Sequence, residues 1–369
     1  MFRQAKILAG LVCLLFLLVS CGGSTTSSNA DKVVAQTFAG YYSNNPNVST
    51  QTPCYWKTDN SGATRTDLPV PSGTTWAQAS SPAVTSGGTV YVAGSYMTNM
   101  NIPCYWAGTT RTDLPMASIS GYAYSIAVDD GTIYVAGKDW NGNGNSPCYW
   151  KVDNTGAVRI DLPVPSGTID ATSISIVVDN DTVYIAGSYH NGSNIPCYWK
   201  VTNSGIIRTD LPVPVGNGYA FSLAVDDGTI FVVGHAWNGT VYSACYWKVD
   251  NTGVVRTELP VPNGTTISTS SALVVNSNGF YIAGTYLNGY DIPCYWQVKT
   301  SGIVRTDLLV PSGDNGFAYT ITIENGTVFT GGYYNDNSQS IPCYWNGTTR
   351  TKLPVPSGDD GVVVVAGQG

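Results

Sequence analysis

The chain has few charged residues and almost no histidine. Charged residues make up 11% of its 369 positions, and histidine occurs 2 times. The 17 basic and 24 acidic residues give a formal net charge of −7, and Lys and Arg form no cluster in the sequence. Because binding to a phosphate backbone needs clustered basic side chains, we exclude nucleic acid as a partner.

Long apolar segments are lacking beyond the N-terminus. No later stretch approaches the roughly 18 consecutive apolar residues of a membrane-spanning helix, so we expect no such helix there. Helical periodicity is also missing, whereas Gly (41), Pro (20) and Tyr (24) are plentiful. The hydrophobic share of 43% is too high for a disordered chain. The composition therefore favours a folded β-protein rich in turns.

The N-terminus has the features of a targeting segment. Arg3 and Lys6 precede an apolar run over residues 7–19. A positive start followed by a short apolar run is typical of a secretory signal peptide. The Leu-Val-Ser-Cys ending at residues 18–21 resembles a bacterial lipobox. That resemblance implies cleavage before Cys21, acylation of its thiol, and export to the cell envelope, on the outer membrane or the cell surface.

The tripeptide Cys-Tyr-Trp is repeated along the rest of the chain. Its copies are 44 to 50 residues apart, and their cysteines are Cys54, Cys104, Cys148, Cys197, Cys245, Cys294 and Cys343. Self-similarity at this period, with β-rich segments between turns, predicts a β-propeller.

Each repeat contains four predicted strands. In the fourth copy they cover residues 173–178, 182–187, 196–201 and 206–211, joined by short polar turns. Three pairs of residues suit two-residue hairpins, which need positive φ: Asp130-Gly131, Asp227-Gly228 and Asn325-Gly326.

The two ends of the repeat region complement each other. Residues 33–42 align with the second strands of the other repeats, so the first repeat lacks its opening strand. Residues 361–366 align with that missing strand. We therefore predict an all-β, seven-bladed β-propeller of four-stranded antiparallel blades, closed by pairing of the C-terminal strand with the first blade. The expected parts are a signal peptide over 1–20, a flexible tether over 21–30, and the propeller over 31–369.

The repeat region resembles known bacterial proteins. An aromatic-Trp-Lys third strand followed by a Thr-Asp-Leu fourth strand is similar to that of exported repeat proteins, and the architecture resembles kelch-like seven-bladed propellers. The resemblance covers about residues 31–369 and implies a fold but no activity, because propellers host many functions.

Residues that recur in every repeat are expected to build the blades. The tryptophans of the signature should pack between blades. Equivalent cysteines on neighbouring blades should lie about 10 Å apart, the spacing of stacked sheets, which is too far for disulfides. We therefore predict buried, free thiols and no metal site. The Arg-x-acid pairs of the fourth strands, such as Arg65 and Asp67, should form local ion pairs at the rim.

The loops that join strands two and three differ between repeats, and they should surround one mouth of the channel. Their side chains are the predicted ligand-binding residues: Tyr96, Trp140, His190, His235, Trp237, Tyr286, Tyr290 and Tyr333. Aromatic and amide side chains suit a glycan, and they also suit a protein partner. We expect a monomeric, lipid-anchored binding module without catalytic residues or cofactors.

Two other functions stay open. A propeller enzyme acting on glycans, a hydrolase or a lyase, would need two carboxylates or a His-acid pair converging at the mouth. The mouth loops offer Asp139, Asp170, Asp291, Asp314 and Asp336, which belong to different repeats. The alternation of Asp139 with three asparagines weakly suggests a calcium loop. A structural envelope protein without a small ligand is the third possibility.

Overall fold

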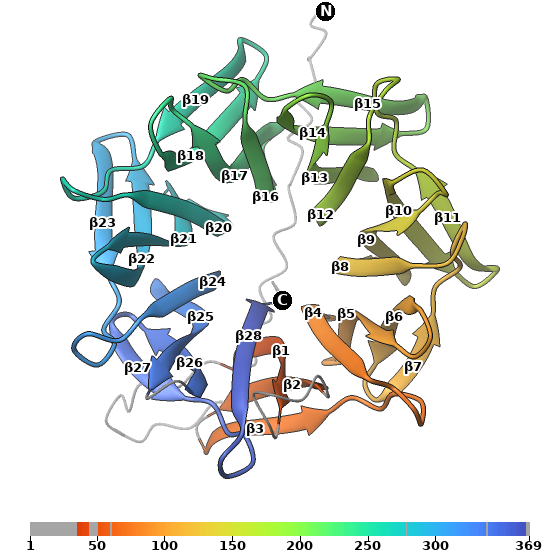
Figure 1. Cartoon of the computed structure of the whole chain (residues 1–369), viewed down its shortest axis with the longest axis horizontal. Coiled ribbons are helices and arrows are strands. Elements are labelled where there is room, and N and C mark those ends of the chain that lie inside the picture. The colour runs from red at the N-terminus through yellow and green to blue at the C-terminus, as the bar shows by residue number, and fades with distance from the viewer. Residues whose placement is uncertain (1–34, 44–50, 60, 278, 337–338, 367–369) are drawn as a thin grey trace, which may run out of the picture. The chain divides into compact units, whose positions relative to one another are not determined.

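A computed structural model describes residues 35–43, 51–59, 61–277, 279–336 and 339–366. The chain divides into residues 1–33 and 34–369, and the described residues all belong to the second part. They form seven four-stranded antiparallel sheets arranged as blades around a central channel (Figure 1). Among the described residues, no helix is long and apolar enough to cross a membrane.

The blades are named A to G, and the strands of each are given from the channel outwards as inner, second, third and outer strand. Blade A consists of β28 (Asp360–Ala366), β1 (Thr37–Ser43), β2 (Thr52–Asp59) and β3 (Gly62–Asp67). Blade B consists of β4 (Trp76–Val84), β5 (Val90–Met97), β6 (Asn101–Ala107) and β7 (Thr110–Asp113). Blade C consists of β8 (Gly121–Asp129), β9 (Thr132–Trp140), β10 (Asn145–Asp153) and β11 (Gly156–Asp161).

The remaining four blades repeat this order. Blade D consists of β12 (Asp170–Asp179), β13 (Thr182–His190), β14 (Asn194–Thr202) and β15 (Gly205–Asp210). Blade E consists of β16 (Gly218–Asp226), β17 (Thr229–Trp237), β18 (Tyr242–Asp250) and β19 (Gly253–Glu258). Blade F consists of β20 (Ile267–Asn276), β21 (Gly279–Asn288), β22 (Tyr290–Lys299) and β23 (Gly302–Asp307). Blade G consists of β24 (Gly316–Glu324), β25 (Thr327–Asp336), β26 (Gln339–Asn346) and β27 (Thr349–Lys352).

The predicted fold and its closure are confirmed. β28 pairs antiparallel with β1, so the last strand of the chain completes the blade that the first strand begins (Figure 1). Gln36, just before β1, also ties this blade to blade G. Its Nε2 donates to Glu324 Oε2 at 2.9 Å, and its Oε1 accepts from Thr322 Oγ1 at 2.5 Å. Closure removes the exposed strand edges that an open ring would have.

Three strands of blade D are longer than the sequence pattern predicts, and the outer strand has the predicted length. β13 was expected to end at Gly187, yet it continues to His190, which pairs with Asp170 on β12 and with Asn194 on β14. The predicted turns are confirmed, and Asp130, Asp227 and Asn325 have positive φ values between 42° and 49°. The added residues at the mouth-facing ends pair with their neighbours because the inner strands extend equally far.

The signature residues build the interfaces between blades, as predicted. All seven signature tryptophans have no exposed surface, and each indole N–H donates to a backbone carbonyl that follows the outer strand of the preceding blade. For Trp247 that acceptor is Pro212 O at 2.7 Å. The seven signature cysteines are buried and free. Burial raises the pKa of every one of these thiols, in Cys245 to about 12.

A β-bulge in every inner strand determines which side chains reach the channel. The pairing with the second strand skips one inner-strand residue in each blade: Ser80, Tyr124, Ile174, Phe221, Ser271, Tyr319 and Val364. A glycine of the second strand lies beneath each bulge. At Gly234, an added Cβ would lie 1.8 Å from the Tyr219 carbonyl oxygen, so the close approach of the two strands requires glycine.

Candidate ligand-binding site at the channel mouth

The channel is hollow between the inner strands. One end is the mouth, where the loops after the second strands meet the loops that lead into the inner strands. The cavity at the mouth has a volume of about 280 Å³. A second cavity of about 300 Å³ follows towards the opposite end, and both cavities are lined by Ser125, Ser175 and Ser222.

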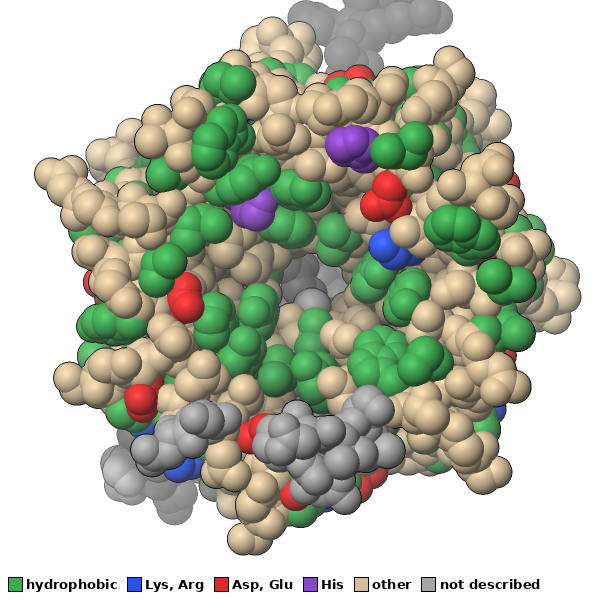
Figure 2. Space-filling model, in the orientation of Figure 1, with side chains coloured by type: hydrophobic (Ala, Val, Ile, Leu, Met, Phe, Trp, Pro, Cys, Tyr) green, Lys and Arg blue, Asp and Glu red, His purple; other side chains and the backbone are tan. Residues whose placement is uncertain are grey.

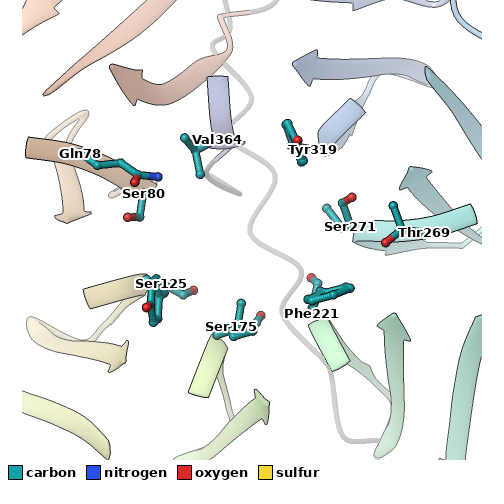
Figure 3. A pocket seen from close by; sticks show the side chains of 13 residues that line it. Gln78, Ser80, Ser125, Ser175, Phe221, Thr269, Ser271, Tyr319 and Val364 are labelled. Atoms are coloured by element: carbon teal, nitrogen blue, oxygen red, sulfur yellow. The ribbon is translucent and has the colours of Figure 1, made fainter. Parts of the chain in front are cut away.

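We call the cavity at the mouth the upper cavity and the second one the lower cavity. The seven bulged residues all line the upper cavity. Side chains from different blades surround the axis in Figure 3, among them Phe221, Ser271, Tyr319 and Val364. Because a bulge re-aims one side chain without disturbing the rest of the strand, these positions can vary while the blade stays intact. The cavity wall is therefore set by residues that the repeat does not constrain.

The wall alternates with a period of two blades. The inner strands of blades C, E and G each carry two aromatic residues separated by alanine, and we call these the aromatic blades. Their pairs are Tyr122 and Tyr124, Tyr219 and Phe221, and Phe317 and Tyr319. The equivalent pairs in blades B, D and F are Gln78 and Ser80, Thr172 and Ile174, and Thr269 and Ser271.

Each aromatic pair forms two parallel rings. The ring centroids are 6.1 Å apart in Tyr122 and Tyr124 and 6.2 Å apart in the other two pairs, and the interplanar angles are between 1° and 7°. Residues two apart on a strand lie on the same side, so the second ring of each pair lies deeper in the channel than the first. Figure 2 shows hydrophobic side chains gathered around the central opening of this face.

The alternation has a cause in the blade interfaces. Ser95, Ser188 and Thr285 occupy one position of the second strand in blades B, D and F, which we call the hydroxyl blades. Their oxygens accept the backbone N–H groups of Ala123, Ala220 and Ala318 on the next aromatic blade, at 2.9, 3.1 and 3.3 Å. These hydroxyls are buried and are used to hold neighbouring blades together.

In the aromatic blades the same second-strand position is occupied by a large side chain. The residues are Lys138, His235 and Tyr333, and each lies against the aromatic pair of its own blade. In blades C and E the interface hydrogen bond comes from the next hydroxyl blade, where Ser173 Oγ donates to Gly137 O and Ser270 Oγ donates to Gly234 O, both at 2.6 Å. Blade G is followed by blade A, which has Val363 at the position of these serines. In blades C and E the second-strand position does not supply the interface hydrogen bond, and it carries a side chain that faces the mouth.

His235 is enclosed by aromatic rings. Its ring centroid is 5.3 Å from that of Tyr219, 5.1 Å from that of Phe221 and 4.8 Å from that of Tyr242. Its Nδ1 lies 3.2 Å from Oγ1 of Thr269, which lines the cavity. Burial lowers the pKa of His235 to about 4, so the imidazole is neutral at physiological pH. The neutral imidazole hydrogen-bonds to the Thr269 hydroxyl and adds no charge to the cavity.

Blade G has a cluster of phenols. Tyr333 stacks on Phe317 with centroids 4.9 Å apart, and it also contacts Tyr319 at 5.9 Å. Burial, followed by the proximity of Tyr333, raises the pKa of Tyr319 well above its usual range. Asp291, on β22, is close enough to raise the pKa of both phenols further, and its own pKa is raised by burial.

Blades C and D each contribute a charged residue to the mouth. Lys138 Nζ lies 5.8 Å from the ring centroid of Tyr122, whose edge also contacts Trp76 on blade B. The exposed Asp170, at the start of β12, acts on the pKa of Tyr124 and Tyr219, both of which are raised, mainly by burial. A cation and an anion therefore lie on the same side of the mouth, so the wall as a whole stays close to neutral.

All eight predicted ligand-binding residues lie at the mouth end of their strands, and the structure brings three of them into the aromatic walls or their rim. His235 and Tyr333 contact the aromatic pairs directly. Trp237 packs against Tyr242 with ring centroids 5.2 Å apart, next to the His235 wall. The other three are peripheral: Trp140 ends β9, Tyr290 is 40% exposed, and His190 contacts Asn194 Oδ1 at 3.0 Å.

The remaining two, Tyr96 and Tyr286, do not face the channel. They are 2% and 3% exposed, because the second strand continues through them and turns them into the blade. Their hydroxyl groups donate to Asp113 and Asp307 at 2.9 and 3.0 Å. An arginine guanidinium lies 4.8 Å from the centre of each ring. Burial and the carboxylate raise the pKa of both tyrosines to about 12, which is consistent with a structural role.

The Arg-x-acid pairs are present as predicted in six blades, with N–O distances of 2.7 to 2.9 Å. Asp139 departs from the expected position in a mouth loop. It is fully buried, contacts Arg159 at 2.7 Å, and accepts the backbone N–H of Ala117 at 2.8 Å. Among the residues that the structure describes, no group of three His, Cys, Asp or Glu side chains could hold a metal ion.

The acidic residues of the mouth are not part of the cavity wall. No carboxylate is found among the described residues that line the upper cavity. The sequence reasoning missed the residues that do line it, above all Tyr124, Phe221 and Tyr319. An aromatic-Ala-aromatic pattern in every second repeat could have indicated these residues. A comparison of each repeat with its immediate neighbour hides this pattern.

Comparison with known proteins shows an architecture shared without close relatives. No protein-family model and no curated protein matches the chain. An ulvan lyase, from a new family of polysaccharide lyases, has a TM-score of 0.52 at 12% identity, over 73% of this chain and 81% of that one. A putative 6-phosphogluconolactonase from Bacteroides fragilis has a TM-score of 0.51 at 11% identity, over 92% and 99%.

A periplasmic gluconolactonase from Pseudomonas aeruginosa is similar to the same degree, with a TM-score of 0.51 at 11% identity over 90% of this chain and 98% of that one. The likeness is one of fold. At these identities the neighbours support the propeller architecture, and they do not transfer an activity.

Proposed function

We propose that the protein is an exported, lipid-anchored binding module whose propeller binds a glycan at the channel mouth. The observation that carries this proposal is the alternation of aromatic pairs with hydroxyl and amide side chains around one small cavity. Aromatic faces pack against the C–H faces of sugar rings, and the side chains between them can hydrogen-bond to sugar hydroxyls. A concave site with apolar walls and a few polar groups is typical of small-ligand recognition.

The charge of the site favours a neutral glycan. The cavity wall carries no carboxylate among the described residues, and the imidazole of His235 is kept neutral by burial. Several structural neighbours are named for sugar-related substrates, a polysaccharide lyase and gluconolactonases among them. They support the proposal only as examples of the same fold.

The anchor in this proposal rests on the sequence. The Leu-Val-Ser-Cys ending at residues 18–21 resembles a lipobox, and a lipid on Cys21 would hold the protein at a membrane through the short Gly/Ser-rich segment that follows.

The binding test uses a soluble form that starts at Ser24, on a glycan array, followed by calorimetry with the glycans that bind. We expect the double variant Phe221→Ala, Tyr319→Ala to lose at least tenfold in affinity, since stacking partners on two walls are removed. The control Ile207→Ala removes an exposed apolar side chain of an outer strand and should bind like the wild type. A blank array, together with capture of a protein ligand by the same mouth, would overturn the glycan proposal in favour of a protein partner.

The anchor is tested separately in a bacterial host. Cys21→Ser should abolish incorporation of an alkyne-labelled fatty acid and release the protein from the membrane fraction. Labelling that persists in this variant would exclude Cys21 as the acylated residue.

Catalysis on a glycan is the second candidate, and one observation favours it. Asp291 has a raised pKa and lies beside the phenols of Tyr319 and Tyr333, so a protonatable carboxyl group adjoins the proposed binding wall. Incubation of bound glycans with wild type and Asp291→Asn, followed by mass spectrometry, decides it. Products that form with the wild type and not with the variant would establish an enzyme.

A further inference from the structure

We propose that the channel binds the end of a glycan chain, which enters along the propeller axis, and not an interior segment lying across the mouth. This inference rests on the proposed glycan-binding function. It concerns which part of the glycan is recognised and how deep it reaches.

The aromatic pairs provide a wall that descends into the channel. The first rings, Tyr122, Tyr219 and Phe317, belong to residues next to the strand starts at the mouth. The second rings lie two residues further along, at a centroid separation of 6.1 to 6.2 Å, parallel to the first. Two residues of a β-strand advance by roughly 6.6 Å, so the pairs are arranged along the strand direction. Such a ladder matches consecutive sugar units that follow the axis.

The deeper rings, and not those at the rim, form the wall of the upper cavity. Tyr124, Phe221 and Tyr319 line it, whereas Tyr122, Tyr219 and Phe317 are outside its lining. Phe221 and Tyr319 come from different sides of the channel, with Thr269 and Ser271 of blade F between them (Figure 3). A ligand that only crossed the mouth would leave these three deeper rings unused.

Polar groups continue below the aromatic rings. Ser125, Ser175 and Ser222 form the border between the upper and the lower cavity. Ser125 Oγ accepts the N–H of Ile176 at 3.2 Å, and Ser175 Oγ accepts that of Leu223 at 3.4 Å. Because the oxygen is the acceptor in these bonds, the hydroxyl proton can donate to a sugar oxygen. The terminal unit would therefore meet hydrogen-bond donors at the depth where the aromatic walls end.

The size of the space fits a chain end. A volume of about 280 Å³ is just below the usual size of ligand pockets, which range from about 300 to 1,000 Å³. It is enclosed by all seven inner strands, so a polymer cannot pass sideways through it. An end-binding site also explains why the specificity residues sit on the bulges, deep in the channel, while the mouth loops are mostly turns.

The first experiment counts binding sites on chains of different length. Soluble xylan, mannan, laminarin and dextran, each with its oligosaccharides, are titrated with the fragment that starts at Ser24, and stoichiometry is measured by sedimentation. End binding predicts that the number of propellers per chain does not rise with chain length. It also predicts that random fragmentation of the polysaccharide, which creates ends, raises the capacity in proportion.

The second experiment blocks the channel. Ser271→Trp places an indole in the upper cavity and should weaken oligosaccharide binding at least tenfold. The matched control Thr240→Trp adds the same side chain to an exposed position of the mouth loop between β17 and β18, and should leave binding within about twofold. Thermal unfolding of both variants, compared with the wild type, shows that the propeller is intact.

The outcomes separate the two proposals. Capacity that rises with chain length, or full binding by Ser271→Trp, overturns end recognition and leaves glycan binding in place. If no saccharide binds to the wild type in the panel or on the array, the proposed function falls and end recognition falls with it.

Discussion

The carboxylate of Asp139 accepts a hydrogen bond from the Arg159 guanidinium at 2.7 Å, inside blade C and out of contact with solvent. In five other blades a tyrosine stands at the position of Asp139 and lies under the arginine of the outer strand. In blade C, the buried carboxylate of Asp139 therefore takes the place of the tyrosine ring and forms an ion pair with Arg159. The arginine also keeps its contact with Asp161 at 2.7 Å.

This buried pair predicts a local weak point. Asp139→Ala should lower the free energy of unfolding by about 3 kcal/mol, because it leaves Arg159 partly buried without its main partner. Glu258→Ala removes a 48% exposed partner of Arg256 and should cost less than about 1 kcal/mol. Urea unfolding followed by tryptophan fluorescence measures both. Equal losses in the two variants would mean that the burial of Asp139 has no energetic consequence.

His235 predicts a dependence of stability on acid pH. Its folded pKa of about 4 is below the unfolded value of 6.5, so the unfolded chain binds the proton first as the pH falls. The stability associated with the neutral ring is complete above about pH 6.5 and is lost as the pH falls to about 4, by about 3 kcal/mol in total. His235→Gln should remove this component, and His190→Gln should not. The check is urea unfolding of all three proteins at pH 7.5 and at pH 4.

The buried thiols predict sensitivity at the other end of the pH scale. Their folded pKa values are raised above the unfolded value of about 8.5. Stability is therefore complete below about pH 8.5 and falls as the pH rises further, by up to about 1.4 kcal/mol per thiol and pH unit. The melting temperature of the fragment starting at residue 31, measured from pH 7 to pH 10, should decrease above that point.

The same thiols should be inaccessible to reagents in the folded protein. A colorimetric thiol reagent at neutral pH should detect none of the seven cysteines in this fragment until denaturant is added, and all seven afterwards. Fewer than seven in denaturant without a reducing agent would reveal a disulfide, contrary to the structure.

Ring closure predicts that the last strand is indispensable. Removal of residues 360–369 takes away β28 and exposes the edge of β1. We expect loss of a cooperative unfolding transition and aggregation through the open edge, as seen by calorimetry and light scattering. Removal of residues 367–369 alone, beyond the strand, should leave the melting temperature within a few degrees of the wild type.

The fold was predictable because one short motif marks a unit of similar length, 44 to 50 residues, in every repeat. The Trp and Cys of the signature are constrained in every blade by the same interface, and the strand missing at the start is visible at the end. Tyr96 and Tyr286 were assigned to loops because polar residues follow the apolar segment of each strand. The alternation of apolar and polar residues then no longer shows where the strand ends. Pairing with the long inner strands extended β5 and β21 through them.

The wall of the upper cavity was harder to predict, because two independent facts determine it. The bulge that turns Phe221 towards the axis depends on Gly234 of another strand, and no feature of residues 218–221 alone indicates it. Lys138, His235 and Tyr333 occupy the second-strand position at which Ser95, Ser188 and Thr285 make interface hydrogen bonds in the other blades. Only the pairing of both strands shows that the same position makes an interface hydrogen bond in one blade and faces the channel mouth in the next.

The two-blade alternation has a consequence for the parity of the ring. Hydroxyl and aromatic types follow one another from B to G, so an odd number of blades must contain one mismatch, and blade A is where it falls. This blade has Val362 and Val364 where an aromatic pair would stand, and it is also the one assembled from both termini. A ring of six or eight blades could alternate without a mismatch, whereas a ring of five, seven or nine must contain one.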